Sequence, residues 1–157
     1  MPASPLDQMT CFSLYAASRA VTQTYRTVLA ESGLTYPQFL VLVALSQQDG
    51  LSVHELGDVM YLDSGTLSPL LRRMEARGVV TRTRQGGDER VVTVSLTPEG
   101  RALQADVATI VECMSPAYGI TSRDELDGLL ASLHRITDGM TALTDTLRQP
   151  DREATPA

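Results

Sequence analysis

Residues 62–96, LDSGTLSPLLRRMEARGVVTRTRQGGDERVVTVSL, decide the fold of this chain. After Asp63, which suits the N-cap of a helix, apolar residues recur at helical spacing as Leu67, Leu70, Leu71 and Met74. Beyond Gly78 the pattern changes to β-branched residues that largely alternate with polar ones, in 79–84 and again in 91–96. A polar, glycine-containing loop separates these two runs. The stretch therefore predicts one capped helix followed by a β-hairpin.

The segments before this stretch predict two further helices. Thr35-Tyr-Pro-Gln38 supplies a cap residue, an early proline and a glutamine three positions on, so a helix starts there and ends at Asp49-Gly50. Ser52-Val-His-Glu55 is a capping box that opens a short helix to about Val59. A short helix, a turn, a second capped helix and a hairpin indicate a winged helix-turn-helix, whose second helix enters the major groove of DNA. Pro69 lies beyond the first turn of that second helix, so we expect local irregularity there.

Long amphipathic helices flank this middle region. The first is predicted from Leu6 to Ala30, and Thr97-Pro-Glu-Gly100 begins another that we expect to run to Met114. Ser122 caps the last helix, whose apolar residues continue at helical spacing to Leu147. The apolar stripes of the end helices are wider than a small winged core can cover. We therefore expect two copies to pack through these ends, with a monomer whose end helices fold back on themselves as the alternative.

The predicted fold is mainly α with a small β-hairpin wing. Residues 35–97 form the winged helix-turn-helix, and residues 6–34 and 98–148 form a helical dimerisation region. The dimer is expected to be intertwined through its N- and C-terminal helices, which sets two recognition helices about one DNA turn apart. We expect residues 149–157 to be a disordered tail.

Composition narrows the class of protein. No stretch approaches the roughly 18 apolar residues of a membrane span, and no basic segment followed by an apolar core opens the sequence, so we expect a cytoplasmic protein. The two cysteines, Cys11 and Cys113, are too far apart in sequence for a metal clip, and there are two histidines, so we expect neither a metal site nor a cofactor.

The charge is distributed unevenly. The chain has a net charge of −6, which by itself argues against nucleic acid, and all 13 of its basic residues are arginines. Residues 60–101 hold seven arginines against five acids, a balance of +2, while the rest holds six against fourteen, a balance of −8. This asymmetry favours a basic stripe that faces DNA on an acidic body, and the alternative is a solvated helix face.

The candidate DNA contacts lie on the second helix and on the wing. Hydroxyls near the start of the helix can meet base edges or phosphates, and arginines further along it and on the wing can meet phosphates. An arginine near the tip of the wing can enter a minor groove, although Asp88 is an alternative ion-pair partner for Arg90. The candidates are Ser64, Thr66, Ser68, Arg72, Arg73, Arg77, Arg82, Arg84, Asp88 and Arg90.

Cys11 in the first predicted helix is a candidate reactive thiol. Tyr15 follows it by one helical turn and can touch it, whereas Tyr25 lies on the same face but about 21 Å along the axis at 1.5 Å per residue. Tyr25 can reach a Cys11 only from an antiparallel partner chain. A thiol near a helix N-terminus with phenol donors can be reactive, while a buried, inert cysteine is the commoner alternative.

Several of these segments resemble the MarR family of winged-helix regulators, and more narrowly its OhrR branch of organic hydroperoxide sensors. The similarity covers about residues 6–148. It rests on the segments Cys11–Arg19, Tyr25-Arg26, Leu34–Gln38, Leu62–Glu75, Asp88–Arg90 and Leu96–Gly100.

The resemblance implies a homodimeric repressor, not an enzyme. Its palindromic operator would be bound when Cys11 is reduced and released when an organic hydroperoxide oxidises Cys11. It also implies that Tyr25 and Tyr36 of the other subunit hydrogen-bond Cys11. Cys113 matches the cysteine that, in two-cysteine members of the branch, forms an intersubunit disulfide with the oxidised thiol.

Three alternatives remain open from the sequence. Cys113 can be buried and inert, in which case a small-molecule thiol would cap the oxidised Cys11 or the thiol would be over-oxidised. A MarR-type repressor can instead be released by a phenolic or other small ligand, with both cysteines structural. A thiol peroxidase needs only a reactive cysteine beside hydroxyl donors, but it gives the wing and its arginines no purpose.

Overall fold

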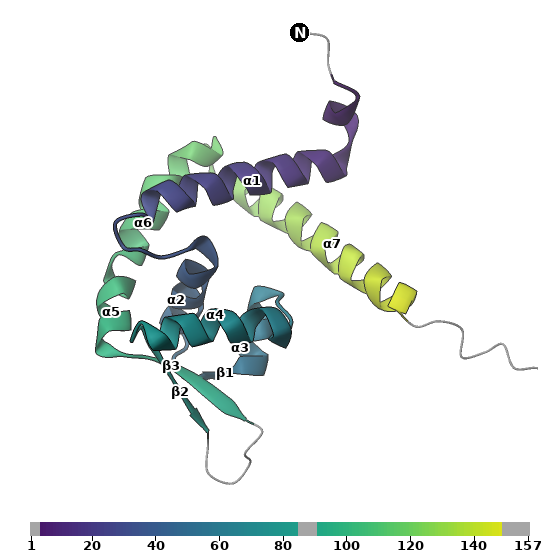
Figure 1. The fold of residues 1–157 in the computed structure, drawn as a ribbon. Coiled ribbons are helices and arrows are strands. Elements are labelled where there is room, and N and C mark those ends of the chain that lie inside the picture. Colours follow the sequence, from purple (N-terminus) through teal and green to yellow (C-terminus); the bar gives the residue numbers. More distant parts are fainter. Residues whose placement is uncertain (1–3, 85–90, 149–157) are drawn as a thin grey trace, which may run out of the picture. The chain divides into compact units, whose positions relative to one another are not determined.

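The computed structural model describes residues 4–84 and 91–148, and the described chain divides into two compact units, up to Val111 and from Glu112 (Figure 1). The first unit contains, in chain order, a 3-10 turn Pro5–Gln8, α1 (Thr10–Val28), α2 (Tyr36–Gln47), β1 (Leu51–Ser52), α3 (Val53–Met60), α4 (Ser64–Ala76), β2 (Val80–Arg84), β3 (Val92–Leu96) and α5 (Pro98–Ala105). The boundary between the units falls within α6 (Val107–Met114). The second unit continues through a 3-10 turn Ser115–Tyr118 to α7 (Arg123–Arg148).

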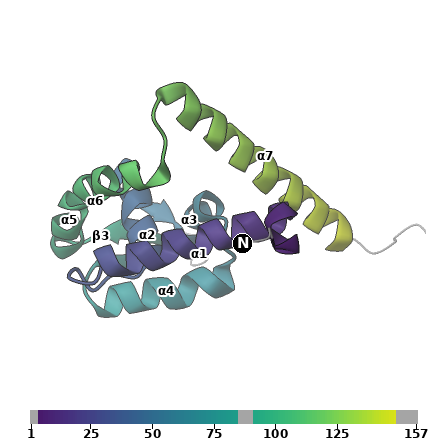
Figure 2. The same ribbon diagram turned by 90° about the horizontal axis from the view of Figure 1, so that it is seen from above.

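Helix α2 is the centre of the first unit. It contacts α1, α3, α4, α5 and β3. The view from above shows α2 among these elements (Figure 2). Phe39, Val41, Leu42 and Leu45 of α2 are buried. The Gln38 side-chain oxygen accepts a hydrogen bond from the Thr35 backbone N–H at 2.9 Å, which satisfies a donor at the start of the helix. The predicted start of this helix is therefore confirmed.

The two helices of the helix-turn-helix begin at the predicted caps. Ser52 Oγ accepts from the Glu55 N–H at 3.1 Å, and the Glu55 carboxylate accepts from the Ser52 N–H at 2.8 Å. Between α3 and α4 the chain turns tightly, and a Cβ placed on Gly57 would lie 2.8 Å from the Leu62 carbonyl oxygen. Glycine at position 57 therefore lets α4 start close behind α3.

Helix α4 departs from the prediction at Pro69. We expected irregularity there, but the helix is continuous from Ser64 to Ala76 with Pro69 inside it. Because proline has no N–H, the Gly65 carbonyl lacks its usual helical donor, and this carbonyl lies in the exposed first turn where water can replace it. The buried Leu67, Leu70, Leu71 and Met74 hold this helix against the core.

Three antiparallel strands form the sheet, in the order β1-β3-β2. The predicted hairpin is present, and it pairs Val80 with Leu96 and Arg84 with Val92. The sequence analysis missed β1, which pairs Leu51 with Val94 and is two residues long, too short for any alternation to register. The predicted loop 85–90 and the predicted tail 149–157 lie outside the described residues.

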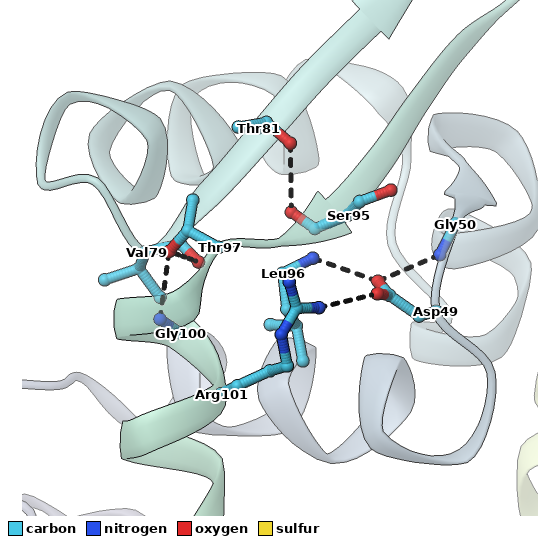
Figure 3. Close-up of polar contacts among 9 residues, drawn as sticks. All are labelled: Asp49, Gly50, Val79, Thr81, Ser95, Leu96, Thr97, Gly100 and Arg101. Carbon is cyan, nitrogen blue, oxygen red and sulfur yellow. Dashed lines mark hydrogen bonds and ion pairs between the residues drawn. The ribbon is translucent and has the colours of Figure 1, made fainter.

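Polar contacts join the base of the wing to α5 (Figure 3). Thr97 Oγ1 accepts from the Gly100 N–H at 3.0 Å and donates to the Val79 carbonyl at 3.1 Å. A Cβ on Gly100 would lie 2.1 Å from that same carbonyl oxygen, so α5 approaches the strand as closely as it does because position 100 is glycine. Asp49 accepts from the Leu96 N–H at 2.9 Å and pairs with Arg101 at 3.2 Å.

Two predicted helix boundaries need correction. The helix expected from Thr97 to Met114 is broken at Asp106 into α5 and α6, with the Asp106 N–H bonded three residues back to Leu103 at 3.3 Å. Nothing in the sequence marks this break, since residue 106 is neither glycine nor proline. The first long helix was expected from Leu6, but a 3-10 turn occupies residues 5–8 and α1 begins at Thr10.

Helix α7 of the second unit has 26 residues and none of them is buried. Its large apolar side chains recur at helical spacing and are exposed: Leu129, Leu130, Leu133, Met140, Leu143 and Leu147. None of the helices in the described ranges combines the length and the apolar character that a membrane span needs.

Candidate nucleic-acid interface and thiol site

The N-terminal end of α4 presents three hydroxyls. Ser64 and Thr66 are exposed and Ser68 is half-buried. Asp63, the N-cap, accepts from the Thr66 N–H at 2.9 Å and from the Thr66 hydroxyl at 3.0 Å. These hydrogen bonds lower the pKa of Asp63 below its ordinary value, so this carboxylate is ionised at neutral pH and fixes the first turn. The Ser64 hydroxyl is thereby set at a helix start that can approach DNA.

Three of the arginines predicted to contact DNA are exposed and take part in no ion pair of the described residues. Arg72 and Arg73 lie on α4, and Arg84 lies at the end of β2. Within residues 4–84 and 91–148 no ion pair engages any of the three. A guanidinium with unpaired donors on a helix or wing is suited to binding phosphate. These three side chains are the strongest structural candidates for backbone contacts.

Two other predicted arginines are engaged within the protomer. Arg77 Nη1 donates to the Gly33 carbonyl at 2.7 Å, and its Nη2 donates to the Ser32 carbonyl. Arg82 Nε and Nη2 both lie 2.8 Å from the Glu75 carboxylate, which also accepts from the Arg82 backbone N–H at 3.2 Å. Their role as DNA contacts stays a prediction, and the structure gives each a structural role as well. Asp88 and Arg90 lie outside the described residues.

Cys11 is an exposed thiol in the first turn of α1. Tyr15, the candidate one turn further on, is 56% exposed, and its hydroxyl accepts from Arg19 Nη1 at 3.3 Å. The Arg19 guanidinium also lies over the Tyr15 ring, 5.8 Å from its centroid. Tyr15 is thus held by Arg19, one helical turn after the thiol.

The other two predicted phenols form a cluster at the far end of α1. Tyr25 is the buried residue of this helix, 5% exposed, and it stacks on Tyr36 of α2 with 4.5 Å between ring centroids. Phe39 lies against the same ring at 5.3 Å. The structure therefore brings Tyr25 and Tyr36 together, as the two would have to be to serve one thiol. It does not bring them to the Cys11 of their own chain, which lies fourteen residues away on one straight helix.

Cys113 is an exposed thiol in α6 and belongs to the second unit. In the described ranges, histidines, cysteines and acidic residues form no group of three that could hold a metal ion.

Sequence reasoning missed two acidic residues, Asp49 and Glu75, that connect parts of the winged region. Asp49 was read as a helix end, yet its carboxylate contacts the end of β3 and the start of α5 (Figure 3). Glu75 was one acid among five in a basic stretch, and it anchors Arg82 of the wing. Partners 7 to 52 positions apart leave no local pattern, so no sequence signal could have found them.

Comparison with known families matches residues 34–92 to the MarR family. A transcriptional regulator of Methylorubrum extorquens, TtmR, is 42% identical over 149 residues, covering 95% of this chain and 76% of the relative. The organic hydroperoxide resistance transcriptional regulator of Bacillus subtilis is 38% identical over 144 residues, covering 92% of each chain.

Solved structures of AbfR, a protein of Staphylococcus epidermidis, are similar in fold and sequence. Reduced AbfR bound to DNA superposes with a TM-score of 0.70 and 32% identity, covering 83% of this chain and 89% of that one. The disulfide form of AbfR gives a TM-score of 0.61 and 33% identity, covering 81% and 88%.

Proposed function

Because the chain belongs to the MarR family of transcriptional regulators, we propose that it is a redox-sensing repressor released from DNA by organic hydroperoxides. The observation that carries the proposal is the arrangement along α1. An exposed thiol, Cys11, lies at one end, and a stacked phenol pair, Tyr25 and Tyr36, lies at the other. These are the groups of a peroxide-sensing thiol site, separated so that two chains are needed to assemble it.

DNA binding is assigned to α4 and the wing. The exposed hydroxyls Ser64 and Thr66 stand at the start of the recognition helix, with Ser68 beside them and with the exposed Arg72 and Arg73 further along. Arg84 extends the same positive surface onto β2. A helix in the major groove flanked by a wing places base-edge contacts at the helix start and phosphate contacts around it. The DNA-bound structure of AbfR, similar over most of the chain, supports this assignment.

A homodimer supplies the second chain. Helix α7 exposes a stripe of leucines and a methionine along its length, among them Leu133, Met140 and Leu143. Helix α1 has 19 residues, of which Tyr25 is buried. An exposed apolar stripe along a long helix is typical of a surface that packs against another chain. In the proposed dimer, Cys11 of one protomer lies against the Tyr25 and Tyr36 of the partner.

The sensing chemistry proceeds in two balanced steps. The Cys11 thiolate attacks the terminal peroxide oxygen, which yields a sulfenic acid and releases the peroxide's alcohol. The Cys113 thiolate of the partner then attacks that sulfur, forming a disulfide and releasing water. Each dimer site reacts once until a reductant restores it, so the protein senses hydroperoxide without turning it over. The accompanying movement would carry α4 and the wing out of register with a palindromic operator.

Release from DNA tests this function directly. A duplex selected by the reduced protein from a random-sequence pool serves as the operator, and binding is followed by fluorescence anisotropy. One equivalent of cumene hydroperoxide per protomer should release the wild-type protein, and dithiothreitol should restore binding. The Cys11→Ser protein should bind the same duplex and stay bound after peroxide. Release of the Cys11→Ser protein by peroxide would overturn the thiol mechanism.

A second candidate function is release by a small apolar ligand, and one observation favours it. A groove of about 490 Å³ lies in the winged part, lined by apolar side chains of α2 and of the end of α3, including Leu40, Val43 and Met60. Its size suits a drug-sized or smaller molecule. Salicylate serves as the probe: release of both the wild-type and the Cys11→Ser proteins by salicylate, without any effect of peroxide, would favour this candidate.

A further inference from the structure

The C-terminal end of α4 is tied to two other parts of the winged region. Arg77 is the C-cap, and Gly78 follows in the left-handed conformation. The Gly78 N–H donates to the Glu75 carbonyl and the Val79 N–H to the Met74 carbonyl, at 2.9 Å each, which closes the helix. This cap fixes the backbone from which the Arg77 side chain leaves the helix. Glu75, two residues earlier, holds Arg82 of the wing. The C-terminal end of α4 is thus a junction, because Glu75 connects it to the wing and Arg77 leaves it toward another segment.

The Arg77 side chain crosses from this junction to the segment that joins α1 to α2. Its two terminal nitrogens donate to two consecutive carbonyls, those of Ser32 and Gly33, at 2.5 and 2.7 Å. Gly33 has a φ of 62°, and a Cβ there would lie 3.3 Å from Arg77 Nη1. Glycine at position 33 therefore serves both the turn and the approach of the guanidinium. The planar guanidinium donates to two adjacent carbonyls at once, and this directional contact, the Arg77 fork, is one that a lysine ammonium does not reproduce.

The same segment is continuous with the phenol pair. It starts after the buried Leu29, one turn past Tyr25, and it ends at the buried Leu34, two residues before Tyr36. A movement of Tyr25 and Tyr36 relative to the rest of the unit would pull on this segment, whose carbonyls Arg77 holds. The Arg77 fork is the polar contact that connects this segment with α4 in the described chain.

We propose that Arg77 is a positioning residue that couples the thiol site to the recognition helix. The proposal rests on the proposed function. When the site around Cys11 rearranges on oxidation, the α1–α2 segment shifts, and the Arg77 fork carries the shift to the C-terminal end of α4. Arg77 acts through these contacts, in which both of its terminal nitrogens donate to backbone carbonyls of its own chain.

The test compares DNA affinity before and after oxidation. The coupling ratio is the dissociation constant of the oxidised protein divided by that of the reduced protein, with the selected duplex as ligand and cumene hydroperoxide as oxidant. A ratio of about 5 to 150 is typical of coupled sites. Loss of a charge-assisted hydrogen bond shifts an equilibrium by about tenfold or more, so the ratio should fall toward one in Arg77→Met. The rate of Cys11 oxidation should stay that of the wild type, because the Arg77 guanidinium donates to the backbone carbonyls of Ser32 and Gly33.

Arg77→Lys separates coupling from phosphate binding. Lysine keeps the charge but not the fork, so a phosphate contact would survive largely intact whereas the coupling ratio should fall as in Arg77→Met. Arg73→Met, one turn earlier on the same helix, is the matched control and should weaken both redox forms equally with the ratio unchanged. Gly33→Ala disturbs the contact from the other side and should lower the ratio even if an Arg77 variant fails to fold.

The outcomes distinguish this inference from the function beneath it. A wild-type ratio of one means that the proposed redox function fails. A wild-type protein that responds, with an unchanged ratio in Arg77→Lys and Gly33→Ala, means that the function holds and the coupling role of Arg77 is wrong. Equal weakening of both redox forms by Arg77→Met, with recovery in Arg77→Lys, would make Arg77 a phosphate contact and overturn the inference.

Discussion

The two ends of α1 differ in nearly every property that matters for a thiol sensor. The N-terminal end presents Cys11 to solvent beside an exposed Tyr15 that is held by Arg19. The C-terminal end buries Tyr25 against the rings of Tyr36 and Phe39. The Cys11 thiol is therefore exposed at one end of α1. The Tyr25 and Tyr36 phenols lie together at the other end of this helix, away from the Cys11 of the same chain. Under the proposed function, the single chain holds two halves of a thiol site that a second chain completes.

The largest effect is expected from removing the thiols, which tests whether Cys11 and Cys113 form the proposed disulfide. One equivalent of cumene hydroperoxide should convert the wild-type protein to a disulfide-linked dimer on a non-reducing gel. That dimer should be absent for Cys11→Ser and for Cys113→Ser, because each variant lacks one sulfur of the bridge. Intact mass should show one added oxygen on Cys113→Ser and none on Cys11→Ser. A covalent dimer in Cys113→Ser would contradict the assignment of that cysteine.

Removing the phenol hydroxyls tests the other end of α1. The double variant Tyr25→Phe/Tyr36→Phe keeps the stacked rings but loses both donors, so the thiolate and its transition state lose stabilisation. Hydrogen bonds to charged groups predict a loss of about 10- to 100-fold in the rate of Cys11 oxidation. The rate is measured by quenched intact mass at fixed peroxide.

Tyr15→Phe is the matched control for this double variant. Its hydroxyl accepts a hydrogen bond from Arg19, so its removal should change the oxidation rate by less than about threefold, the low end of the range for one hydrogen bond. A larger effect of Tyr15→Phe than of the double variant would reassign the donor to the next turn of the thiol's own helix.

Weakening the dimer tests whether a second chain is needed at all. Leu133 lies in the exposed apolar stripe of α7, and a charge in a packed interface costs at least about 2 kcal/mol, so Leu133→Arg should raise the dimer dissociation constant about 30-fold or more. Sedimentation velocity measures the constant. Asp138→Arg, on the opposite face of the helix, should leave it unchanged. Equal effects of the two substitutions would place the interface elsewhere.

The smallest expected effect concerns the start of α4, away from both ends of α1. Hydrogen bonds from Thr66 lower the pKa of Asp63 below its ordinary value of 3.8, so the folded state favours the ionised form. This contribution to stability is fully present above the ordinary pKa and is lost as pH falls through the lowered one. The unfolding temperature of Asp63→Asn should therefore depend less steeply on pH in this acidic range. Identical profiles for the two proteins would contradict the assignment.

The sequence predicted the features that depend on residues close together in the chain, and it missed those that depend on distant residues. The caps at Ser52 and Asp63 and the alternation of β2 and β3 are local patterns, and the structure confirms all of them. The two-residue β1 and the break at Asp106 were missed, because tertiary pairing and packing decide them without a local signal.

The candidate site divides in the same way. The predicted face shared by Cys11 and Tyr25 follows from helical periodicity, and the placement of Tyr36 came from the family resemblance and agrees with the stacking seen here. The partners of Arg77 could not be predicted, since the contact joins residues 44 and 45 positions apart. An arginine in a basic stretch looks the same in sequence whether it binds phosphate or a carbonyl of its own chain.

A hybrid dimer tests the central claim, that two chains assemble one thiol site, most directly. Co-expression with two affinity tags yields a dimer of one Cys11→Ser chain and one Tyr25→Phe/Tyr36→Phe chain. Its single Cys11 then lies on the chain without phenols and faces the partner that keeps them. We predict that this thiol is oxidised by cumene hydroperoxide at the wild-type rate. Oxidation at the slow rate of the Tyr25→Phe/Tyr36→Phe homodimer would show that each thiol uses the tyrosines of its own chain, and would contradict the account.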